Sequence, residues 1–200
     1  MNILVIGLGA IGSNLIRFLI PDLRGEHLVA LLDHDLVEER NVQAGTQFYY
    51  DFQIGEAKAE ALQFNIYKQF RKTITNHYTE KLDEDSELYK HLKGNTDKHI
   101  AFDLVVDCTD NFATRRLTST LPQEIIHIGF SNSFTFSIEW NKGYKPPTDY
   151  IEPFDICTMP GAASFVNHVA SLGALVIQEY IETKTRREII GGKFSLTNMI

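Results

Sequence analysis

The sequence feature that most constrains the fold is a glycine-rich turn close to the first residue. An apolar run, residues 3–6, leads directly into Gly7-Leu8-Gly9-Ala10-Ile11-Gly12, and an amphipathic segment follows. This order predicts a strand, a tight turn and a helix. Glycines at the first, third and sixth positions allow a sharp bend, the approach of a phosphate to bare backbone, and close packing of the helix on the strand. Such a turn also forms without a ligand, so the motif alone does not decide between a structural and a binding role.

Asp33 favours a bound nucleotide over a purely structural turn. It ends a second apolar run, residues 28–32, and lies 21 residues beyond Gly12. In dinucleotide-binding folds, an acidic side chain at about this spacing accepts hydrogen bonds from a ribose. The helix N-terminus offers free N–H groups and a partial positive charge to a phosphate. We therefore predict that the turn binds an adenine nucleotide.

Composition and charge limit the cellular setting and the partners. The 200 residues, 44% of them hydrophobic, predict a single domain over residues 1–200 that folds without disulfide bonds. A net charge of −7 argues against a nucleic-acid partner, because an acidic protein lacks the basic face that binds phosphates of a nucleic acid. Met1 runs directly into a predicted strand without a signal-peptide pattern, and the longest apolar helix, residues 165–181, is interrupted by polar side chains. We therefore expect a cytoplasmic protein with no membrane partner.

Beyond the turn, predicted strands and helices alternate. The predicted strands are residues 28–33, a short segment around 74–78, 102–107, 125–129, 135–140, and a hairpin over 188–196 that turns at Gly191-Gly192; the predicted helices are 56–70, 112–121 and 165–181, with weak helical character over 82–94. This alternation predicts an α/β fold, a Rossmann-like doubly wound, mostly parallel sheet with helices on both faces and a C-terminal antiparallel extension. Ligands of such sheets bind at the carboxyl ends of the strands.

Four polar residues are expected to converge at the glycine turn. Asp33, Asn41, Lys58 and Asp110 each follow a predicted strand or begin a predicted helix. They are too many for ribose recognition alone, and they fit transfer at a phosphate, where a lysine neutralises oxygens and a carboxylate holds magnesium. Lys58 lies in the first turn of its predicted helix, where a cation opposes the helix dipole. A bound polyphosphate would offset that cost, and a solvated lysine is the alternative.

Five motifs follow one another in a recognisable order. They are the glycine turn, Asp33-x-Asp35-x-Val37-Glu38-x-x-Asn41, Gly55-x-x-Lys58-Ala59, Asp107-Cys108-Thr109-Asp110-Asn111-Phe112 with Arg115, and the helix after Cys157. In this order and spacing they resemble the ThiF/MoeB/HesA-type adenylating enzymes, relatives of the enzymes that activate ubiquitin-like proteins. The resemblance spans nearly the whole chain, which makes it far more specific than a lone glycine motif.

The resemblance implies an ATP-dependent reaction. The C-terminal carboxylate of a small ubiquitin-like or sulfur-carrier protein, or of a peptide, would form an acyl adenylate with release of pyrophosphate. By this resemblance Asp33 holds the ribose, Asn41 and Lys58 contact the phosphates, and Asp110 binds Mg²⁺. The family also implies a homodimer or a heterodimer. The nucleotide-binding set that it implies is Gly7, Gly9, Ala10, Ile11, Gly12, Asp33, Asp35, Asn41, Lys58, Asp110, Asn111 and Arg115, with Arg115 in a supporting role.

Cys157 is a candidate nucleophile. Cys157-Thr158-Met159-Pro160 resembles the thioester-forming segment of the ubiquitin-type activating enzymes, and it lies in a proline-bearing loop, residues 141–160, just ahead of a predicted helix. A helix N-terminus favours the thiolate. The alternative is a small buried thiol. We favour the nucleophile for Cys157, whereas Cys108, at the end of a predicted buried strand, is expected to be structural.

Departures from the family pattern leave three functions open. Ala44 and Gly45 stand where the family has an arginine and a glutamine, and neither an N-terminal arginine-bearing segment nor paired zinc cysteines are present in this sequence. A partner or Arg40 then supplies the cation, or the nucleotide is bound without turnover. The chain is accordingly an activating enzyme, a catalytically silent partner subunit of one, or an NAD-dependent oxidoreductase or nucleotide sensor. The third function leaves Lys58 and the Asp107-to-Asn111 run without a role.

Overall fold

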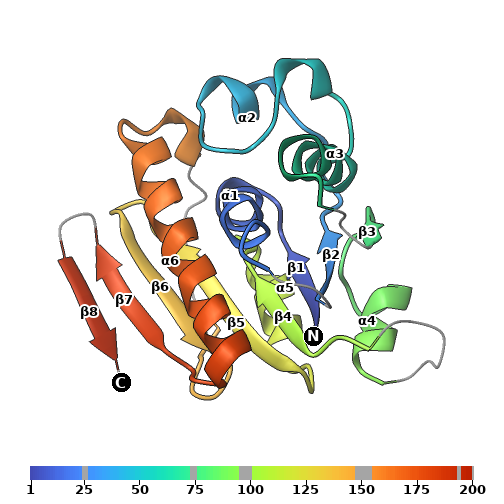
Figure 1. The fold of residues 1–200 in the computed structure, drawn as a ribbon, viewed down its shortest axis with the longest axis vertical. Coiled ribbons are helices and arrows are strands. Elements are labelled where there is room, and N and C mark those ends of the chain that lie inside the picture. The colour runs from blue at the N-terminus through green and yellow to red at the C-terminus, as the bar shows by residue number, and fades with distance from the viewer. Residues whose placement is uncertain (24–26, 73–75, 95–100, 147–154, 193–194, 200) are drawn as a thin grey trace.

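A single mixed sheet organises the protein, as the computed structural model shows (Figure 1). The structure describes residues 1–23, 27–72, 76–94, 101–146, 155–192 and 195–199. The strands are β1 (Asn2–Ile6), β2 (Leu28–Leu32), β3 (Asn76–Tyr78), β4 (Leu104–Asp107), β5 (Glu124–Phe130), β6 (Thr135–Trp140), β7 (Glu188–Gly192) and β8 (Ser195–Met199). The helices are α1 (Ala10–Leu19), α2 (Glu39–Gln43), α3 (Lys58–Phe70), α4 (Glu87–Leu92), α5 (Phe112–Thr118) and α6 (Ala162–Thr183), with 3₁₀ turns η1 (Asp51–Gln53) and η2 (Ile156–Thr158).

The strand order places the glycine turn at a binding position. Among the described residues the sheet runs β3-β2-β1-β4-β5-β6-β7-β8, parallel from β3 to β5 and antiparallel from β5 to β8. The predicted Rossmann-like sheet with a C-terminal antiparallel extension is therefore confirmed. The order reverses between β1 and β4, and ligands of open α/β sheets bind outside the carboxyl ends of strands at such a switch point. The glycine turn follows β1, and the Asp110 segment follows β4.

Helices cover both faces of the sheet, as predicted. Alternate residues of β1 point to opposite faces: Ile3 and Val5 pack with α1, α3 and α6, whereas Leu4 and Ile6 pack with α4 and the end of α5 (Figure 1). Helix α6 lies close to α1 and the sheet at Gly173, where an added Cβ would come within 2.7 Å of Ile128 Cδ1. None of the described helices has the length and apolar character needed to cross a membrane.

Several predicted boundaries were wrong for local reasons. The C-terminal hairpin is confirmed, but Gly191 and Gly192 belong to β7 and pair with Leu196 and Ser195, so the chain reverses only after Gly192. The segment after Asp33, predicted as a polar loop, contains α2, a helix too short for a periodic pattern to be visible. Ile74 of the predicted third strand, residues 95–98 and residues 147–154 lie outside the described residues.

Replacing Gly12 by alanine is expected to destabilise the fold. An alanine Cβ at this position would lie 1.9 Å from the carbonyl oxygen of Gly7, so β1 and α1 would have to move apart. We expect Gly12→Ala to lower the free energy of unfolding by roughly 2–4 kcal/mol in urea titrations. Gly9→Ala is the matched control, because no atom lies within 4 Å of its added Cβ, and it should change stability by less than about 1 kcal/mol. Equal stability of the two variants would contradict the close helix–strand contact.

Candidate nucleotide-binding site

The glycine turn is enclosed by the segments that follow the two neighbouring strands. Gly7 has a φ of 82°, which favours glycine, and its N–H donates to the carbonyl of Leu32 at the end of β2 over 2.9 Å. On the other side, a Cβ on Gly7 would lie 2.9 Å from the backbone nitrogen of Thr109, which follows β4. The turn therefore fits only because both Gly7 and Gly12 lack side chains.

The first turn of α1 has unused hydrogen-bond donors. Within the part of the chain that the structure describes, no acceptor pairs with the backbone N–H groups of Gly9, Ala10, Ile11 and Gly12. No acidic side chain lies in the first turn of α1 to compensate them. Free N–H groups at the N-terminus of a helix form an anion-binding site. This is the arrangement predicted for a phosphate.

Asp33 is buried, and it fixes the shape of the turn. One carboxylate oxygen accepts the N–H of Leu8 over 2.6 Å, and the other accepts the N–H of Asp35 over 2.8 Å. Burial raises the pKa of Asp33, and the nearby positive charge of Lys58 partly offsets that rise. Each carboxylate oxygen can accept a further hydrogen bond. The assigned contact between Asp33 and a ribose therefore stays a prediction that this geometry permits.

Lys58 is a buried cation beside this carboxylate. Its Nζ donates to Asp35 Oδ2 over 3.0 Å, and its backbone N–H donates to the Asp35 carbonyl over 2.9 Å. The Lys58 side chain is only 8% exposed, so the solvated-lysine alternative is wrong, whereas Asp35 is 51% exposed. An ammonium group carries three donors, and Asp35 accepts one of them. Asp35 offsets the unfavourable helix-dipole position of Lys58 and leaves donors for a second anion.

Tyr49 also contacts the glycine turn, a contact that was not predicted from the sequence. Its buried hydroxyl donates to the Leu8 carbonyl in the glycine turn over 2.7 Å. Burial raises the pKa of Tyr49 well above its usual value, and the charges of Asp33 and Asp35 add to this effect, so the hydroxyl stays a neutral donor. Three aromatic residues in a row, residues 48–50, gave no periodic signal from which this contact could be predicted.

Asn41 is buried, but its described contact is local. Its Oδ1 accepts the N–H of Glu38 over 2.9 Å, which completes the capping box of α2. The neighbouring Arg40 is held by two carboxylates, Glu38 at 2.6 Å and Asp155 at 3.1 Å. Ala44, at the place of the family's arginine, ends α2. The phosphate contact assigned to Asn41 therefore stays a prediction, and Arg40 ties α2 to the segment that carries Cys157.

A buried carboxylate also shapes the Asp110 segment. Asp107 Oδ1 accepts the N–H and the hydroxyl of Thr109, over 3.0 and 2.7 Å, and Oδ2 accepts the hydroxyl of Thr118 over 2.6 Å and faces Nδ1 of His127 at 3.1 Å. Burial alone would raise the pKa of Asp107, but the charge of Arg115 and the hydrogen bonds from His127 and Thr118 outweigh burial and hold that pKa well below its usual range. Asp107 is thus a charged carboxylate that hydrogen bonds hold in place at the start of the segment that carries Asp110.

Arg115 supports this segment from below. Its Nε donates to the Thr109 carbonyl over 2.7 Å, its Nη2 to the Ile128 carbonyl over 2.8 Å, and its Nη1 to the Tyr144 hydroxyl over 3.2 Å. A Cβ on Gly129 would lie 2.9 Å from Nη2, so the guanidinium needs a glycine at that position. These contacts fit the supporting role predicted for Arg115.

Asn111 and Asp110 have different surroundings. Asn111 Oδ1 accepts the N–H groups of Ala113 and Thr114 and so caps the N-terminus of α5. Asp110 is exposed, and its carboxylate has no protein partner within the described residues. It is therefore available as an oxygen ligand for a divalent cation, the role predicted for it. Asp33, His34 and Asp35 form a second group of possible ligands, with one atom of each within 4.8 Å of the others.

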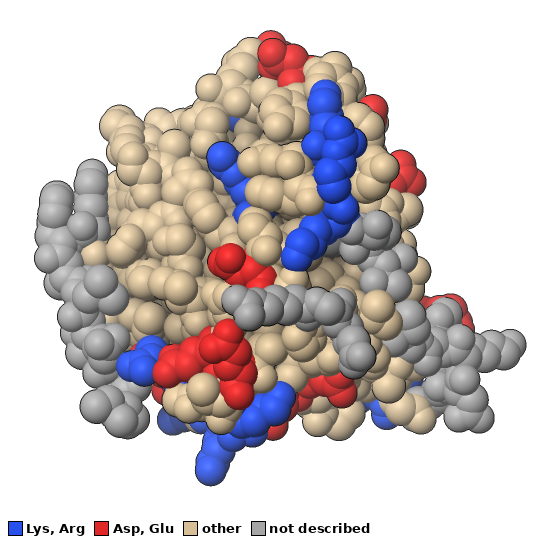
Figure 2. All heavy atoms as spheres, viewed as in Figure 1, with Lys and Arg blue, Asp and Glu red and all other residues tan. Residues whose placement is uncertain are grey.

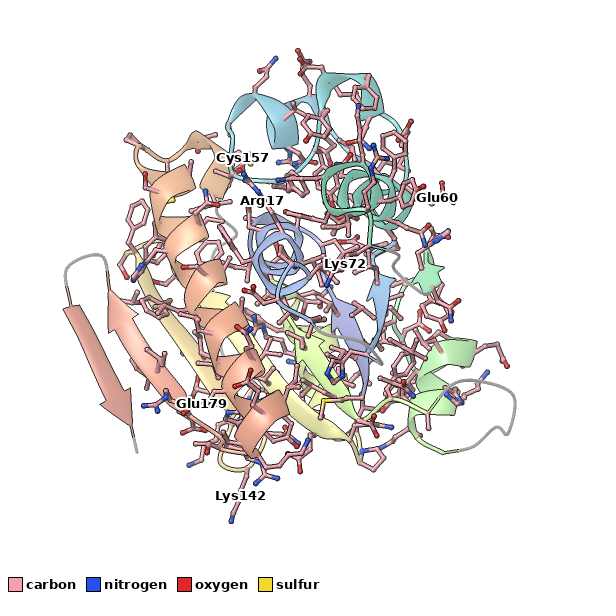
Figure 3. All side chains as sticks on the ribbon, viewed as in Figure 1. Arg17, Glu60, Lys72, Lys142, Cys157 and Glu179 are labelled. Carbon is pink, nitrogen blue, oxygen red and sulfur yellow. The ribbon has the colours of Figure 1, made fainter. Side chains whose placement is uncertain are left out.

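Cys157 lies near the start of α6, beside the segment after α2 (Figure 3). Its Sγ is 3.2 Å from the Thr46 hydroxyl and 3.9 Å from Gln47 Nε2, and its N–H donates to Asp155 over 2.9 Å. The carbonyl of Thr46 in turn accepts a hydrogen bond from Asn14 of α1. Cys157 is thus half-buried rather than in an open loop. Burial raises the pKa of the Cys108 thiol well above its usual value, which fits its predicted structural role.

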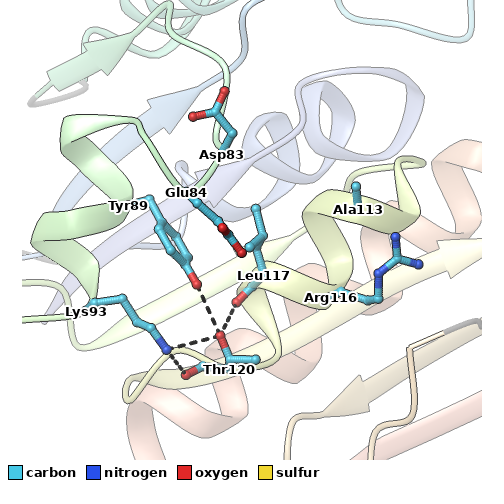
Figure 4. Close-up of a pocket in the computed structure, with 8 residues that line it drawn as sticks. All are labelled: Asp83, Glu84, Tyr89, Lys93, Ala113, Arg116, Leu117 and Thr120. Carbon is cyan, nitrogen blue, oxygen red and sulfur yellow. Dashed lines mark hydrogen bonds between the residues drawn. The ribbon is translucent and has the colours of Figure 1, made fainter.

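The opposite face of the sheet has a separate hollow of about 600 Å³ between α4 and α5 (Figure 4). Tyr89 and Lys93 line it from the α4 side and Ala113 and Arg116 from the α5 side, and Asp83 and Glu84 also line it. Arg116 is exposed. None of the predicted nucleotide-binding residues lines this hollow.

A protein-family model matches the part of the chain that carries most of the candidate site. The model, described as ThiF family, matches residues 1–125, more than half of the chain and the part that carries the glycine turn, Asp33, Lys58 and Asp110. The chain belongs to the ThiF family. The predicted resemblance to ThiF-type adenylating enzymes is thus confirmed. A comparison with the sequences of curated proteins finds no match.

Solved structures share the fold of this ThiF-family chain. Escherichia coli MccB, determined with MccA-N7isoASN, superposes with a TM-score of 0.74 at 16% identity, over 99% of this chain and 64% of MccB. MccB with ATP gives a TM-score of 0.72 at 16% identity, over 99% and 63% of the two chains. PaaA gives 0.66 at 14% identity, over 99% and 62%. The chain thus spans slightly less than two thirds of the length of these structures.

Asp107→Asn is expected to destabilise the protein most at neutral pH. A group whose pKa is lowered by folding stabilises the fold above its unfolded pKa of about 4, and this contribution is lost as the pH falls toward the folded value. Removing the charge also leaves Arg115 buried without its carboxylate. We expect a loss of about 3–5 kcal/mol at pH 7 that shrinks steadily below about pH 4, measured by urea unfolding across pH. Asp22→Asn, at an exposed position, is the control. A loss of stability that does not depend on pH would contradict the lowered pKa of Asp107 in the folded protein.

Proposed function

We propose that this ThiF-family protein uses ATP to adenylate the C-terminal carboxylate of a peptide or of a small ubiquitin-like or sulfur-carrier protein. The observation that carries the proposal is the buried Lys58 ammonium beside Asp33 and the glycine turn. A buried cation next to free helix N–H groups fits a polyphosphate better than a nicotinamide dinucleotide, whose pyrophosphate needs only the turn. Membership of the ThiF family agrees with this choice.

In this proposal the segments around the turn have separate roles. The N–H groups of residues 9–12 and Lys58 bind phosphate oxygens, and Asp33 accepts a hydrogen bond from the ribose. Asp110 is the ligand for Mg²⁺, which would supply charge neutralisation at the phosphates. The substrate carboxylate attacks the α-phosphorus, and pyrophosphate leaves. Holding these groups in place before the reaction is the main contribution of the protein to the rate.

The structural neighbours support ATP and a peptide as substrates. MccB was determined with ATP and, separately, with N-formylated MccA. The identity to this chain is only 15–16%, so the likeness establishes the fold and motivates the substrates. Asn41 as a phosphate ligand, cytoplasmic localisation, and a homodimer or heterodimer are further parts of the proposal that follow from the family.

A catalytically silent partner subunit is the second candidate. Ala44 replaces the family's arginine, and the two carboxylates that hold Arg40 compete with any phosphate for its charge. A subunit of this kind would bind ATP without exchanging pyrophosphate. The enzyme and the silent subunit therefore differ in whether they turn ATP over and not in how tightly they bind it.

Lys58→Met is expected to remove nucleotide affinity while leaving the fold intact. The Asp35 carboxylate is half exposed and needs no buried partner, but the buried Asp33 loses its nearby positive charge and keeps only the N–H groups of Leu8 and Asp35. The free energy of unfolding should therefore fall by about 1–3 kcal/mol, and the protein should stay folded. ATP affinity, measured by calorimetry with Mg²⁺, should fall by at least about tenfold. Lys142→Met, at an exposed lysine far from the turn (Figure 3), should bind ATP normally. Unchanged ATP affinity in Lys58→Met, or tighter binding of NAD than of ATP, would contradict the proposal.

Pyrophosphate exchange tests turnover directly. The wild-type protein should exchange labelled pyrophosphate into ATP when a peptide or carrier with a free C-terminal carboxylate is added. The same peptide with an amidated C-terminus is the matched control, because it lacks the nucleophile. Asp110→Asn should abolish exchange. ATP binding without exchange with any free-carboxylate substrate would favour the silent subunit.

Cys157→Ser tests a second step on the same assay. If Cys157 takes the acyl group from the adenylate as a thioester, the variant should retain exchange within about threefold of wild type and lose a carrier adduct that added thiols cleave by acyl exchange. Thr46→Val, which removes the hydroxyl next to Sγ, probes whether that contact orients the thiol. A thiol-cleavable adduct that persists in Cys157→Ser would show that Cys157 is not the acceptor.

A further inference from the structure

An exposed aromatic surface lies on η1 and α3, outside the nucleotide site. We use the name aromatic surface for Tyr50, Phe52, Phe64 and Tyr67. They are four of the nine large apolar side chains that are exposed among the described residues, so such side chains cluster here instead of being scattered. Tyr50 stacks on Phe52 with ring centroids 5.7 Å apart, and Phe52 meets Phe64 edge to face at 6.2 Å. A contiguous group of this kind marks an interaction site more often than scattered single side chains do.

A buried amide pair holds the two elements of the aromatic surface together. Gln53 of η1 and Asn65 of α3 are both fully buried, and Asn65 Nδ2 donates to Gln53 Oε1 over 2.8 Å. Gln53 Oε1 also accepts the N–H of Tyr50, and Gln53 Nε2 donates to the carbonyl of Ala61, over 3.1 Å in each case. These buried hydrogen bonds fix the turn against the helix. The aromatic rings are therefore in place before a partner arrives, which lowers the entropic cost of binding.

Two cations border the aromatic surface at the C-terminal end of α3. Lys68 Nζ lies 5.5 Å from the ring of Phe52 and 5.7 Å from that of Phe64, and the Arg71 guanidinium lies 5.8 Å from the ring of Tyr67. Of the carboxylates that the structure describes, none lies within 4.0 Å of either cation. On the face shown in Figure 2, basic side chains gather over α3. A partner of this surface should therefore supply negative charge beside apolar groups.

Acidic side chains lie at the N-terminal end of α3 and in the segment before it. Glu60, Phe64 and Lys68 follow one another at intervals of four residues, so they share one face of the helix. Glu60 is 59% exposed, and Asp51 and Glu56 are exposed as well. These carboxylates would repel an anionic membrane or a nucleic acid, because both carry negative charge throughout. The charge pattern instead fits a peptide segment that places its carboxylates beside the C-terminal end of α3 alone.

We propose that the aromatic surface is the docking site for an acidic, apolar peptide segment of a partner protein. Large apolar side chains of the segment pack on Phe52, Phe64 and Tyr67, and its aspartate or glutamate side chains pair with Lys68 and Arg71. Aromatic residues and arginine are enriched in the cores of protein interfaces. Exposed ion pairs add little affinity, but they orient the segment and exclude basic ones. We expect a dissociation constant on the order of micromolar.

The docking site is separate from adenylation. Lys58, the first residue of α3, directs its buried side chain to Asp35 Oδ2, and Phe64 lies six residues later, about 9 Å further along the helix axis. The segment docks through its side chains and needs no free C-terminal carboxylate, unlike an adenylation substrate. Phe64→Ser should therefore lose peptide binding and still bind ATP, so the docking site and the proposed function can fail independently.

Selection from a phage-displayed library of random short peptides tests the class of ligand. The displayed peptides are joined to the coat protein at their C-termini, so they offer no carboxylate for adenylation. The intact wild-type chain, with Phe64→Ser used for counterselection, should enrich peptides that combine aspartate or glutamate with leucine, phenylalanine or tryptophan. No peptide whose binding depends on Phe64, or enrichment of peptides without acidic residues, would overturn the proposal.

Fluorescence anisotropy with the most strongly selected peptide, amidated at its C-terminus, tests the contacts. Phe64→Ser and Lys68→Glu should each weaken binding at least about tenfold without loss of helix content or thermal stability. Leu175→Ser, at a side chain that is 61% exposed on α6, and Lys142→Glu, at an exposed lysine away from α3 (Figure 3), are the matched controls and should stay within about threefold of wild type. Equal weakening by the controls would overturn the proposal.

A charge swap tests the ion pairing. Peptides in which one acidic residue at a time is replaced by lysine should bind the wild-type chain more weakly. At least one of them should bind Lys68→Glu at least about tenfold more tightly than the unchanged peptide does, because its lysine then faces the introduced glutamate. Lack of any such rescue would exclude an ion pair at Lys68 and contradict the assigned orientation of the segment.

Two other occupants of the surface would give different results. Pelleting of the wild-type chain with vesicles of phosphatidylserine and phosphatidylcholine, lost in Phe64→Ser, would show that the surface binds a membrane. A dimer that forms in sedimentation across a concentration series and is lost in Phe64→Ser would show that a second copy covers it. Either result would overturn the proposed docking of a peptide segment.

Discussion

Two buried carboxylates, Asp33 and Asp107, hold the candidate site in shape. Asp33 follows β2 and Asp107 is the last residue of β4, the strands on either side of β1, so the two carboxylates flank the glycine turn. Each accepts the N–H of the residue two positions on, over 2.8 Å at Asp35 and 3.0 Å at Thr109. Each also has a buried cation nearby, Lys58 for Asp33 and Arg115 for Asp107. A carboxylate left without such partners would be too costly to bury.

The two arrangements differ in how completely the charge is compensated. Burial still raises the pKa of Asp33, because Lys58 donates its hydrogen bond to Asp35 instead. Around Asp107, Arg115, His127 and Thr118 more than offset burial, and the pKa is low. The Asp107 side is therefore a fixed support for the Asp110 segment. The charge of Asp33 is compensated less completely. A ligand with both hydrogen-bond donors and acceptors should therefore gain most binding energy beside Asp33.

The sequence predicted the central features of the fold because they depend on local patterns. The β1–turn–α1 unit needs only an apolar run, three glycines and an amphipathic segment, all of which are adjacent in the chain. The position of Lys58 in the first turn of its helix was likewise predicted from the sequence. The contact between Lys58 and Asp35 was not predicted, because Asp35 lies 23 residues away in the chain. The two side chains meet only because α3 packs next to β2. The same holds for Tyr49, whose hydroxyl meets Leu8 across 41 residues.

The sequence by itself determined that the chain forms a Rossmann-like sheet with a glycine turn at its switch point, because strand and helix periods and glycine positions are properties of short segments. Only the tertiary structure decided which side chains lie close together. In the tertiary structure Asn41 caps a helix, Arg40 pairs with Asp155, Cys157 lies next to Thr46, and Phe64 and Tyr67 of α3 are exposed. These outcomes follow from how distant segments pack, and a pattern within one segment carries no information about its neighbour in space.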